Sequence, residues 1–190
     1  WPGGRAVGGS SAVNGMIWVR GDPLEYNNWA SLGNSGWGYD DVLPYFKKAE
    51  NQQRGPDKYH GDSGPLPVSD WRHHDPLSEA FVVAAAETGI PTNPDFNGAT
   101  QEGAGFFQTT TRRGRRASTA FAYLRPAKAR GNLHVVTSSL AQRILFEGRR
   151  AKAVEYKQEG RVRTARARKE ILVSSGAYNS PQLLQLSGVG

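Results

Sequence analysis

The stretch from Gly4 to Met16 limits the possible folds of this chain more than any other part of its sequence. The adjacent glycines Gly8 and Gly9 let the backbone pass close to another surface, and small polar residues follow them. Residues 12–17 then predict the start of a helix. A glycine-rich turn at a helix N-terminus presents free N–H groups and a positive dipole end, which suits a phosphate. A tight turn with a serine N-cap explains the same residues, because short glycine motifs are weak evidence of an anion site.

A second stretch of the same character lies at the other end of the sequence. The apolar run Ile171–Ser174 predicts a buried strand, and it leads directly into the small residues Ser175 and Gly176. A helix is predicted over 180–186, where Ser-Pro supplies its start. Strand, small-residue turn and helix is the order that lets a backbone approach a nucleotide.

Capping residues and periodic apolar positions divide the remaining sequence into helices and strands. Asp22 and Asp75, each followed by proline, predict helix N-termini, and Gly89 predicts the end of the second of these helices. Pro44 is expected in the first turn of its helix, and Pro126 is expected to end another. The predicted helices cover 22–29, 40–50, 75–88 and 118–124, and the predicted strands cover 65–68, 106–111, 133–137, 143–146, 151–156 and 162–167.

The net charge of +7 is concentrated in three basic clusters, which lie within 112–116, 149–152 and 161–169. One interpretation is a face that binds a polyanion. The interpretation that we favour is a set of solvated hairpin edges, because no aromatic residues alternate with the basic ones as single-strand binding requires. We therefore predict no nucleic-acid partner.

Other classes of site receive little support. The chain has no cysteine, which excludes thiolate metal sites, and no apolar run approaches the roughly 18 residues of a membrane span. His60, His73 and His74 lack the spacing of metal ligands, so we predict no metal and expect surface or packing histidines. His134 is expected to be structural within its strand.

The absence of a secretory segment is compatible with a cytoplasmic location, although a chain that begins with Trp1 says little about it.

Two signatures at the ends of the sequence carry a more specific indication. The first runs from Gly4 to Asn27 and includes Trp18, and the second runs from Gly176 to Gly190. The stretches 37–46, 61–65 and 116–124 between them are of the same type. Together these motifs resemble the glucose–methanol–choline family of flavin-dependent oxidoreductases, over essentially all 190 residues.

The resemblance implies an α/β fold: a portion of a Rossmann-like domain that binds flavin adenine dinucleotide (FAD), plus part of an antiparallel-sheet α+β substrate domain. Residues 1–59 would form an FAD-binding segment and lid. Residues 60–130 would belong to the substrate domain, and residues 131–190 would return to the FAD-binding domain.

The resemblance also implies which residues meet the FAD. Those expected at the pyrophosphate and ribityl groups are Gly8, Gly9 and Ser10. Those expected at the flavin ring, largely through backbone atoms, are Asn14, Gly15, Met16 and Ile17. Those expected near the adenosine half are Ala141, Ser175 and Gly176. Some family members attach the flavin covalently through a histidine just before the asparagine; this chain has Val13 there, so we predict non-covalent FAD.

The activity implied is oxidation of a small primary alcohol, choline-like or other, to an aldehyde by hydride transfer to the flavin. The electron acceptor is left open. Candidates to line the substrate cavity are Trp18, Phe106, Phe107 and Gln108, although ordinary core packing explains each of them equally well. The alternatives are a family member with a lyase reaction or a structural flavin, and a basic module that binds polyanions.

Two features of the family are absent from this sequence. There is no Gly-x-Gly-x-x-Gly fingerprint, and the four histidines do not match the catalytic histidine and its partner near the family's C-terminus. We therefore assign no catalytic residue within the chain, and we expect it to be an internal segment of a longer protein. Alone, such a segment is expected to bind FAD weakly or not at all and to turn over no alcohol.

Overall fold

The computed structural model describes residues 3–190, which form two compact units. The first unit ends at Leu133, and the second comprises His134–Gly190. This division lies close to the domain boundary expected at 130/131, whereas the boundary expected at 59/60 falls inside the first unit.

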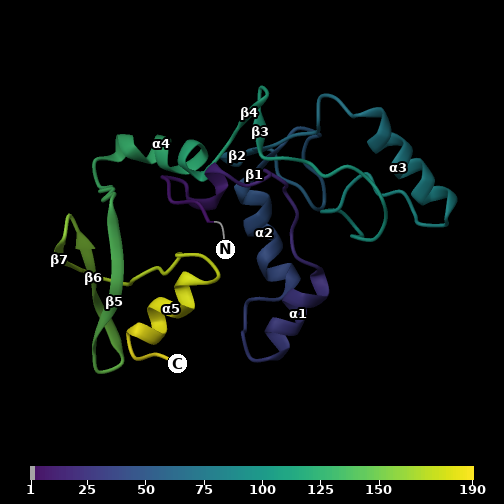
Figure 1. Cartoon of the computed structure of the whole chain (residues 1–190). Helices are drawn as coiled ribbons and strands as arrows, with labels where there is room; N and C mark the ends of the chain where they lie inside the picture. Colours follow the sequence, from purple (N-terminus) through teal and green to yellow (C-terminus); the bar gives the residue numbers. More distant parts are fainter. Residues whose placement is uncertain (1–2) are drawn as a thin grey trace. The chain divides into compact units, whose positions relative to one another are not determined.

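The first unit has three longer helices, and two of them begin directly after a capping aspartate (Figure 1). Helices α1 (Pro23–Ser31) and α3 (Pro76–Glu87) start at a proline, and the aspartate before each accepts a hydrogen bond from a backbone N–H two residues later. Helix α2 (Tyr39–Ala49) has acidic residues in its first turn and lysines in its last, as the helix dipole favours. These three predicted helices are confirmed. The short helical segments are η1 (Gly9–Ala12), η2 (Ala120–Leu124), α4 (Arg125–Ala127) and η3 (Lys128–Arg130).

Two small strand pairs complete the regular structure of the first unit. Strands β1 (Glu50–Gln52) and β2 (Leu66–Val68) are parallel, and strands β3 (Thr111–Arg112) and β4 (Arg115–Arg116) form an antiparallel hairpin. The prediction of β2 is confirmed. Glu50 was predicted to be helical but begins β1, because its backbone is already extended and its carboxylate is held by neighbouring loops.

The buried side chains of the first unit are mainly polar. Those that are apolar are Leu66, Val68, Ala117 and Ala122. Those that are polar or charged are Arg20, Glu50, Gln52, His60, Asn93, Asn97, Gln108 and Thr109. In contrast, Leu77 and Phe81 on the apolar face of α3 are 79% and 72% exposed. Hydrogen-bonded networks, rather than helix faces, therefore hold the centre of this unit together.

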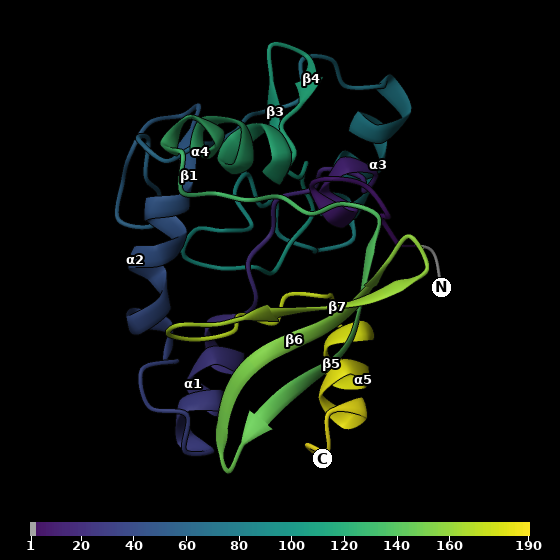
Figure 2. The ribbon, with the colours of Figure 1, turned by 90° about the vertical axis from the view of Figure 1, so that its left-hand side faces the viewer.

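The second unit is an antiparallel three-stranded sheet with one helix beside it (Figure 2). Strands β5 (Ser139–Glu147), β6 (Arg150–Gln158) and β7 (Arg161–Arg166) follow one another as a meander, and helix α5 (Asn179–Leu186) packs on β5. The Ile144 N–H donates to Ser187 Oγ at 2.7 Å, and Leu183, Ile144 and Ala153 are buried. The strands predicted over 143–146, 151–156 and 162–167 are confirmed, as is the helix predicted over 180–186.

Three helix predictions need correction. Residues 12–17 do not form a helix: η1 ends at Ala12, and the Met16 carbonyl accepts from the Thr110 N–H, which fixes the chain in another direction. Pro44 lies in the second turn of α2 rather than the first. Pro126 does not end a helix but lies in the first turn of α4, where a missing N–H costs little, and the π-turn η2 precedes it.

Three strand predictions are also wrong. Within 106–111 only Thr109 makes isolated bridges, to Ile17 and Ser69, before β3 starts at Thr111. Residues 133–137, which include His134, form no strand. The run Ile171–Ser174 pairs with no strand among residues 3–190, and Leu172 is 82% exposed. A strand requires a hydrogen-bonding neighbour, and an apolar sequence does not supply one by itself.

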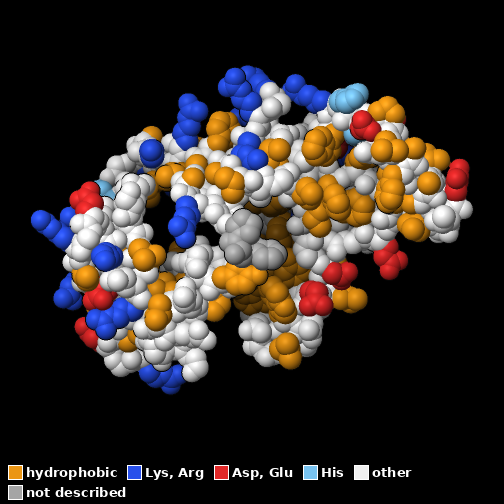
Figure 3. All heavy atoms as spheres, viewed as in Figure 1, with side chains coloured by type: hydrophobic (Ala, Val, Ile, Leu, Met, Phe, Trp, Pro, Cys, Tyr) orange, Lys and Arg blue, Asp and Glu red, His pale blue; other side chains and the backbone are white. Residues whose placement is uncertain are grey.

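The basic clusters lie on hairpins, as the favoured interpretation expects. The first covers the β3–β4 hairpin, where Figure 3 shows Lys and Arg side chains gathered at the surface, and the others lie at the β5–β6 turn and along β7.

Candidate functional site

The glycine-rich stretch packs on the segment before η2. The Gly8 carbonyl accepts from Thr119 Oγ1 at 3.1 Å, and the Thr119 N–H donates to Ser11 Oγ at 3.0 Å. A Cβ at Gly8 would lie 3.1 Å from that of Ala120, and φ there is 100°. The expected close approach of the backbone is therefore present at Gly8.

The other side of the same stretch is open. Nothing lies within 4 Å of the position that a Cβ would occupy at Gly9 or Gly15. Ser10 lies in η1 and accepts a hydrogen bond from the Gly4 N–H at 3.2 Å. Because η1 is a single short turn, the helix dipole that the sequence suggested is not available at this point. What the stretch offers a ligand is an exposed, fixed backbone.

Residues 14–17 are fixed by side-chain and backbone hydrogen bonds. Asn14 Oδ1 accepts from the Met16 N–H at 3.1 Å and from Arg116 Nη1 at 2.9 Å. Met16 has φ of 65°, which is uncommon for a residue other than glycine. Its carbonyl accepts from the Thr110 N–H at 2.8 Å, and Ile17 bridges Thr109. The four candidate residues of the flavin ring thus form one ordered turn.

The three candidates for the adenosine half belong to the second unit, so the structure describes them separately. Ala141 lies in β5 opposite Tyr156, next to an irregularity of the strand register. The Ser175 N–H donates to Ser180 Oγ at 2.9 Å, and Gly176 has φ of 91°. This bond closes a tight turn ahead of α5, although the strand predicted before it is absent.

The candidates for a substrate cavity do not border one common hollow. Trp18 borders an apolar hollow of about 700 Å3 beside α1 and α2. Phe106 and Phe107 border a different hollow, of about 480 Å3, where Phe106 stacks on His74 with ring centres 3.9 Å apart. Gln108 is buried and donates to Asp70 and Gln52, so it borders neither hollow.

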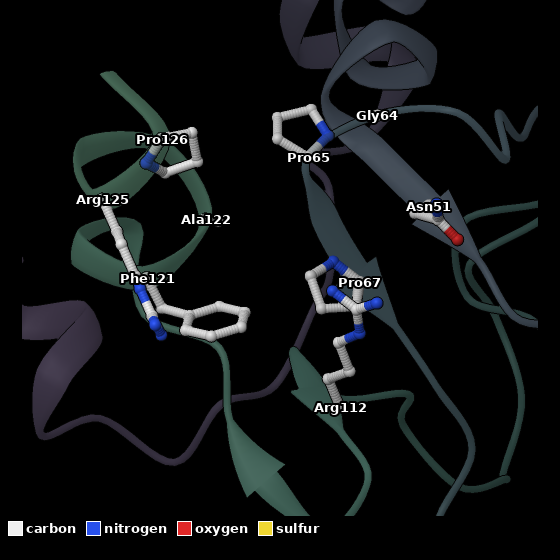
Figure 4. Close-up of a pocket in the computed structure, with 9 residues that line it drawn as sticks. All are labelled: Asn51, Gly64, Pro65, Pro67, Arg112, Phe121, Ala122, Arg125 and Pro126. Carbon is white, nitrogen blue, oxygen red and sulfur yellow. The ribbon is translucent and has the colours of Figure 1, made fainter. Parts of the chain in front are cut away.

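A third hollow, of about 610 Å3, lies between the β1–β2 pair and the η2–α4 segment. Figure 4 shows two arginines at its edge, Arg112 from β3 and Arg125 from α4, and prolines on opposite sides of it. The Arg125 guanidinium lies 6.0 Å from the ring centre of Phe121. None of the residues bordering it was a candidate for the FAD or substrate site from sequence, and Arg112 was named only as part of a basic cluster.

A buried ion cluster lies next to the ordered turn, and sequence reasoning missed it. Glu50 Oε1 lies 2.6 Å from Arg20 Nη2 and 2.9 Å from His60 Nδ1, and its side chain is fully buried. The other ring nitrogen of His60, Nε2, lies 2.9 Å from Asp95 Oδ2. His60 was expected to be a surface or packing histidine. The cluster joins strand β1, which carries Glu50, to three separate loops, and no spacing in the sequence indicates it.

Hydrogen bonds set the protonation of this cluster. Burial alone would lower the pKa of His60, but the hydrogen bonds to Asp95 and Glu50 outweigh it and raise that pKa to about 9. Burial alone would raise the pKa of Glu50 and of Asp95, but the bonds from His60, together with Arg20 beside Glu50, hold both below their ordinary values. At neutral pH the cluster therefore pairs two cations with two carboxylates.

Among residues 3–190, no group of three His, Asp or Glu side chains has an arrangement that could hold a metal ion. No helix in that range has the length and apolar character needed to cross a membrane.

Comparison with known proteins gives a consistent set of matches. The family model for GMC oxidoreductases matches residues 1–190. The oxygen-dependent choline dehydrogenase of Burkholderia cenocepacia (strain HI2424) is 52% identical over 98% of this chain and 34% of its own length. The mitochondrial choline dehydrogenase of Mus musculus is 47% identical over 100% and 32%. The chain thus spans about a third of these relatives.

Two solved structures match over 98% or more of this chain. The pyridoxine 4-oxidase of Mesorbium loti has a TM-score of 0.92 at 33% identity, covering 100% of this chain and 38% of that one. An FAD-dependent oxidoreductase of Chaetomium thermophilum has a TM-score of 0.90 at 30% identity, covering 98% and 35%.

Proposed function

Since the chain belongs to the GMC oxidoreductase family, we propose that residues 1–190 supply part of the FAD site of an enzyme that oxidises a small primary alcohol. Choline is the first candidate substrate, because the choline dehydrogenases quoted above are about half identical to this chain. FAD bound by these residues would supply the acceptor for the hydride of the alcohol carbon.

One observation carries the proposal: the turn at residues 8–16 is packed on one side and open on the other. Gly8 rests on Thr119 and Ala120, whereas nothing lies within 4 Å of the Cβ positions at Gly9 and Gly15. Because this backbone is already ordered, it can contact a flat or phosphorylated ligand without a further loss of conformational entropy. The residues present therefore fit an FAD, and their role is to bind and orient it.

We propose that the FAD is held without a covalent bond. Val13 stands directly before Asn14, and its hydrocarbon side chain has no atom that could attach to a flavin. Precipitating the enzyme with acid should release all of the flavin into solution. Flavin that stays with the precipitated protein would contradict this proposal.

We propose no proton-transfer residue among residues 3–190. The general base that takes the hydroxyl proton is assigned, by family resemblance, to a histidine outside this chain. The cytoplasmic location stays a prediction, as does the contribution to a substrate cavity of Trp18, Phe106, Phe107 and Gln108. We propose no electron acceptor.

The decisive experiment is anaerobic reduction of the complete flavoprotein that contains this chain. Choline should bleach the absorbance of the oxidised flavin, whereas tetramethylammonium, which has the same charged group but no hydroxyl, should not. Bleaching by other primary alcohols but not by choline would remove choline as the substrate. A bound flavin that no alcohol reduces would overturn the proposed oxidation and favour a lyase or a structural flavin.

A further inference from the structure

The segment that follows the ordered turn is clamped from two sides. On one side, the Trp18 N–H donates to the Gln108 carbonyl at 2.9 Å, continuing the contacts of Met16 and Ile17 with 109–110. On the other side, Trp18 Nε1 donates to Glu50 Oε2 at 2.9 Å. Residues 16–20 therefore lie between the backbone of residues 108–110 and the buried carboxylate of Glu50.

Glu50 is the common acceptor of the side-chain contacts on the second side of this segment. Its Oε2 accepts from Trp18, and its Oε1 accepts from Arg20 and from the Gly61 N–H and lies against His60 Nδ1. Four donors on a carboxylate that is 0% exposed fix its orientation, and an ionised acceptor makes each bond strong. Two of these donors come from the segment directly after Ile17.

Asn97 reinforces the same segment through its amide. Its Oδ1 accepts from the Arg20 N–H at 2.7 Å, and its Nδ2 donates to the Trp18 carbonyl at 2.9 Å. The backbone of 18–20 thus cannot shift without breaking bonds to buried groups. Because Met16 and Ile17 precede it directly, their position is set by the same contacts.

We propose that Glu50 is a positioning residue for the flavin: through Trp18 and Arg20 it holds the backbone of residues 14–17 in the place where the isoalloxazine ring binds. This inference rests on the proposed function. Glu50 does not touch the ring or the alcohol, so its effect reaches the flavin through Trp18 and the turn before it.

The test uses the complete flavoprotein with two variants and a matched control. Glu50→Gln keeps the shape of the side chain but removes its charge and turns one acceptor into a donor. Trp18→Phe removes the donor to Oε2 and leaves the Arg20–Glu50–His60 contacts in place. Glu87→Gln makes the same chemical change as the first variant at an exposed position of α3.

The measurements are the dissociation constant of FAD and the visible circular dichroism of the bound flavin, with the thermal midpoint recorded beside them. We expect Glu50→Gln to weaken FAD binding about tenfold, since a charge-assisted bond is lost, and both variants to change the visible dichroism. Glu87→Gln should match the wild type in both.

Each outcome has a distinct meaning. Variants with a lower thermal midpoint but wild-type FAD affinity and dichroism would overturn the positioning role and leave Glu50 a structural residue. If Glu50→Gln does not fold, Trp18→Phe decides: altered dichroism supports the inference, and unaltered dichroism rejects it. A wild-type protein that binds no FAD would instead refute the proposed function itself.

Discussion

Raising the pH should lower the free energy of unfolding of the first unit, because a single group, His60, loses its proton. Its pKa is about 9 in the folded chain and has an ordinary value of 6.5, so the folded state keeps a proton that the unfolded state loses. Stability from this proton is complete below pH 6.5 and is lost as the pH rises through about 9. At about 1.4 kcal/mol for each tenfold change, the difference amounts to about 3 kcal/mol. The imidazole is 4% exposed, so solvent screens it little.

Tryptophan fluorescence is a suitable assay, because all five tryptophans precede residue 72 and so report the first unit alone. Urea unfolding at several pH values from 6 to 9.5 should give free energies that fall continuously across this range. Carboxylates that face His60, those of Glu50 and Asp95, stay ionised throughout, and Tyr39, whose pKa is raised above 10, titrates later.

Two results would refute this reasoning. The first is an unfolding free energy that stays constant between pH 6.5 and 9. The second is a His60 ring proton that titrates near 6.5 by NMR in the folded chain. A His60→Gln variant, which cannot titrate here, should lose the pH dependence even though its stability is lower at pH 6.

Three other changes have expected outcomes that stability measurements can check. Gly61→Ala should destabilise the first unit by about 2 kcal/mol or more, because the new Cβ would overlap the Lys47 backbone carbonyl; an unchanged urea midpoint would contradict this. Arg116→Ala should cost about 1–2 kcal/mol and loosen the turn, since it removes the donor to Asn14; hydrogen exchange should speed up at residues 14–17 rather than uniformly. Glu155→Ala should leave the free energy of unfolding nearly unchanged, because the ion pair that it breaks has an exposed partner and solvent screens it; a clear fall in the urea midpoint would contradict this.

Local signals predicted the parts of the fold that depend on neighbours in sequence. Asp22 and Asp75 cap the helices that follow them because the hydrogen bond reaches only two residues along the chain. The hairpins of the second unit were equally accessible, since Gly148 and Gly160, both with positive φ, mark their turns.

Non-local contacts explain most of the failures. The helix predicted from Ala12 is absent because Thr110, almost a hundred residues away, bonds the Met16 carbonyl. Ile171–Ser174 has the composition of a buried strand, but a strand depends on a partner that composition does not specify.

The candidate site also contains one part that local sequence predicts and one part that it does not. The turn at Gly8 and Gly9 was visible as a motif, because glycine is needed where a side chain would collide or φ is positive. The Arg20–Glu50–His60 cluster was not, because its members occur at irregular spacing and each one alone has the composition of a surface residue.

The mainly polar interior of the first unit has a consequence for its thermal behaviour. Apolar surface raises the heat capacity when a protein unfolds, and polar surface lowers it. Buried groups such as Arg20, Asn97 and Gln108 therefore give this unit a smaller heat-capacity increment than an apolar core of equal size would. A smaller increment flattens the curve of stability against temperature, so cooling weakens such a unit less. The penalty for burying its charges also falls on heating, which makes the ion cluster a better source of stability in a warm solution than in a cold one.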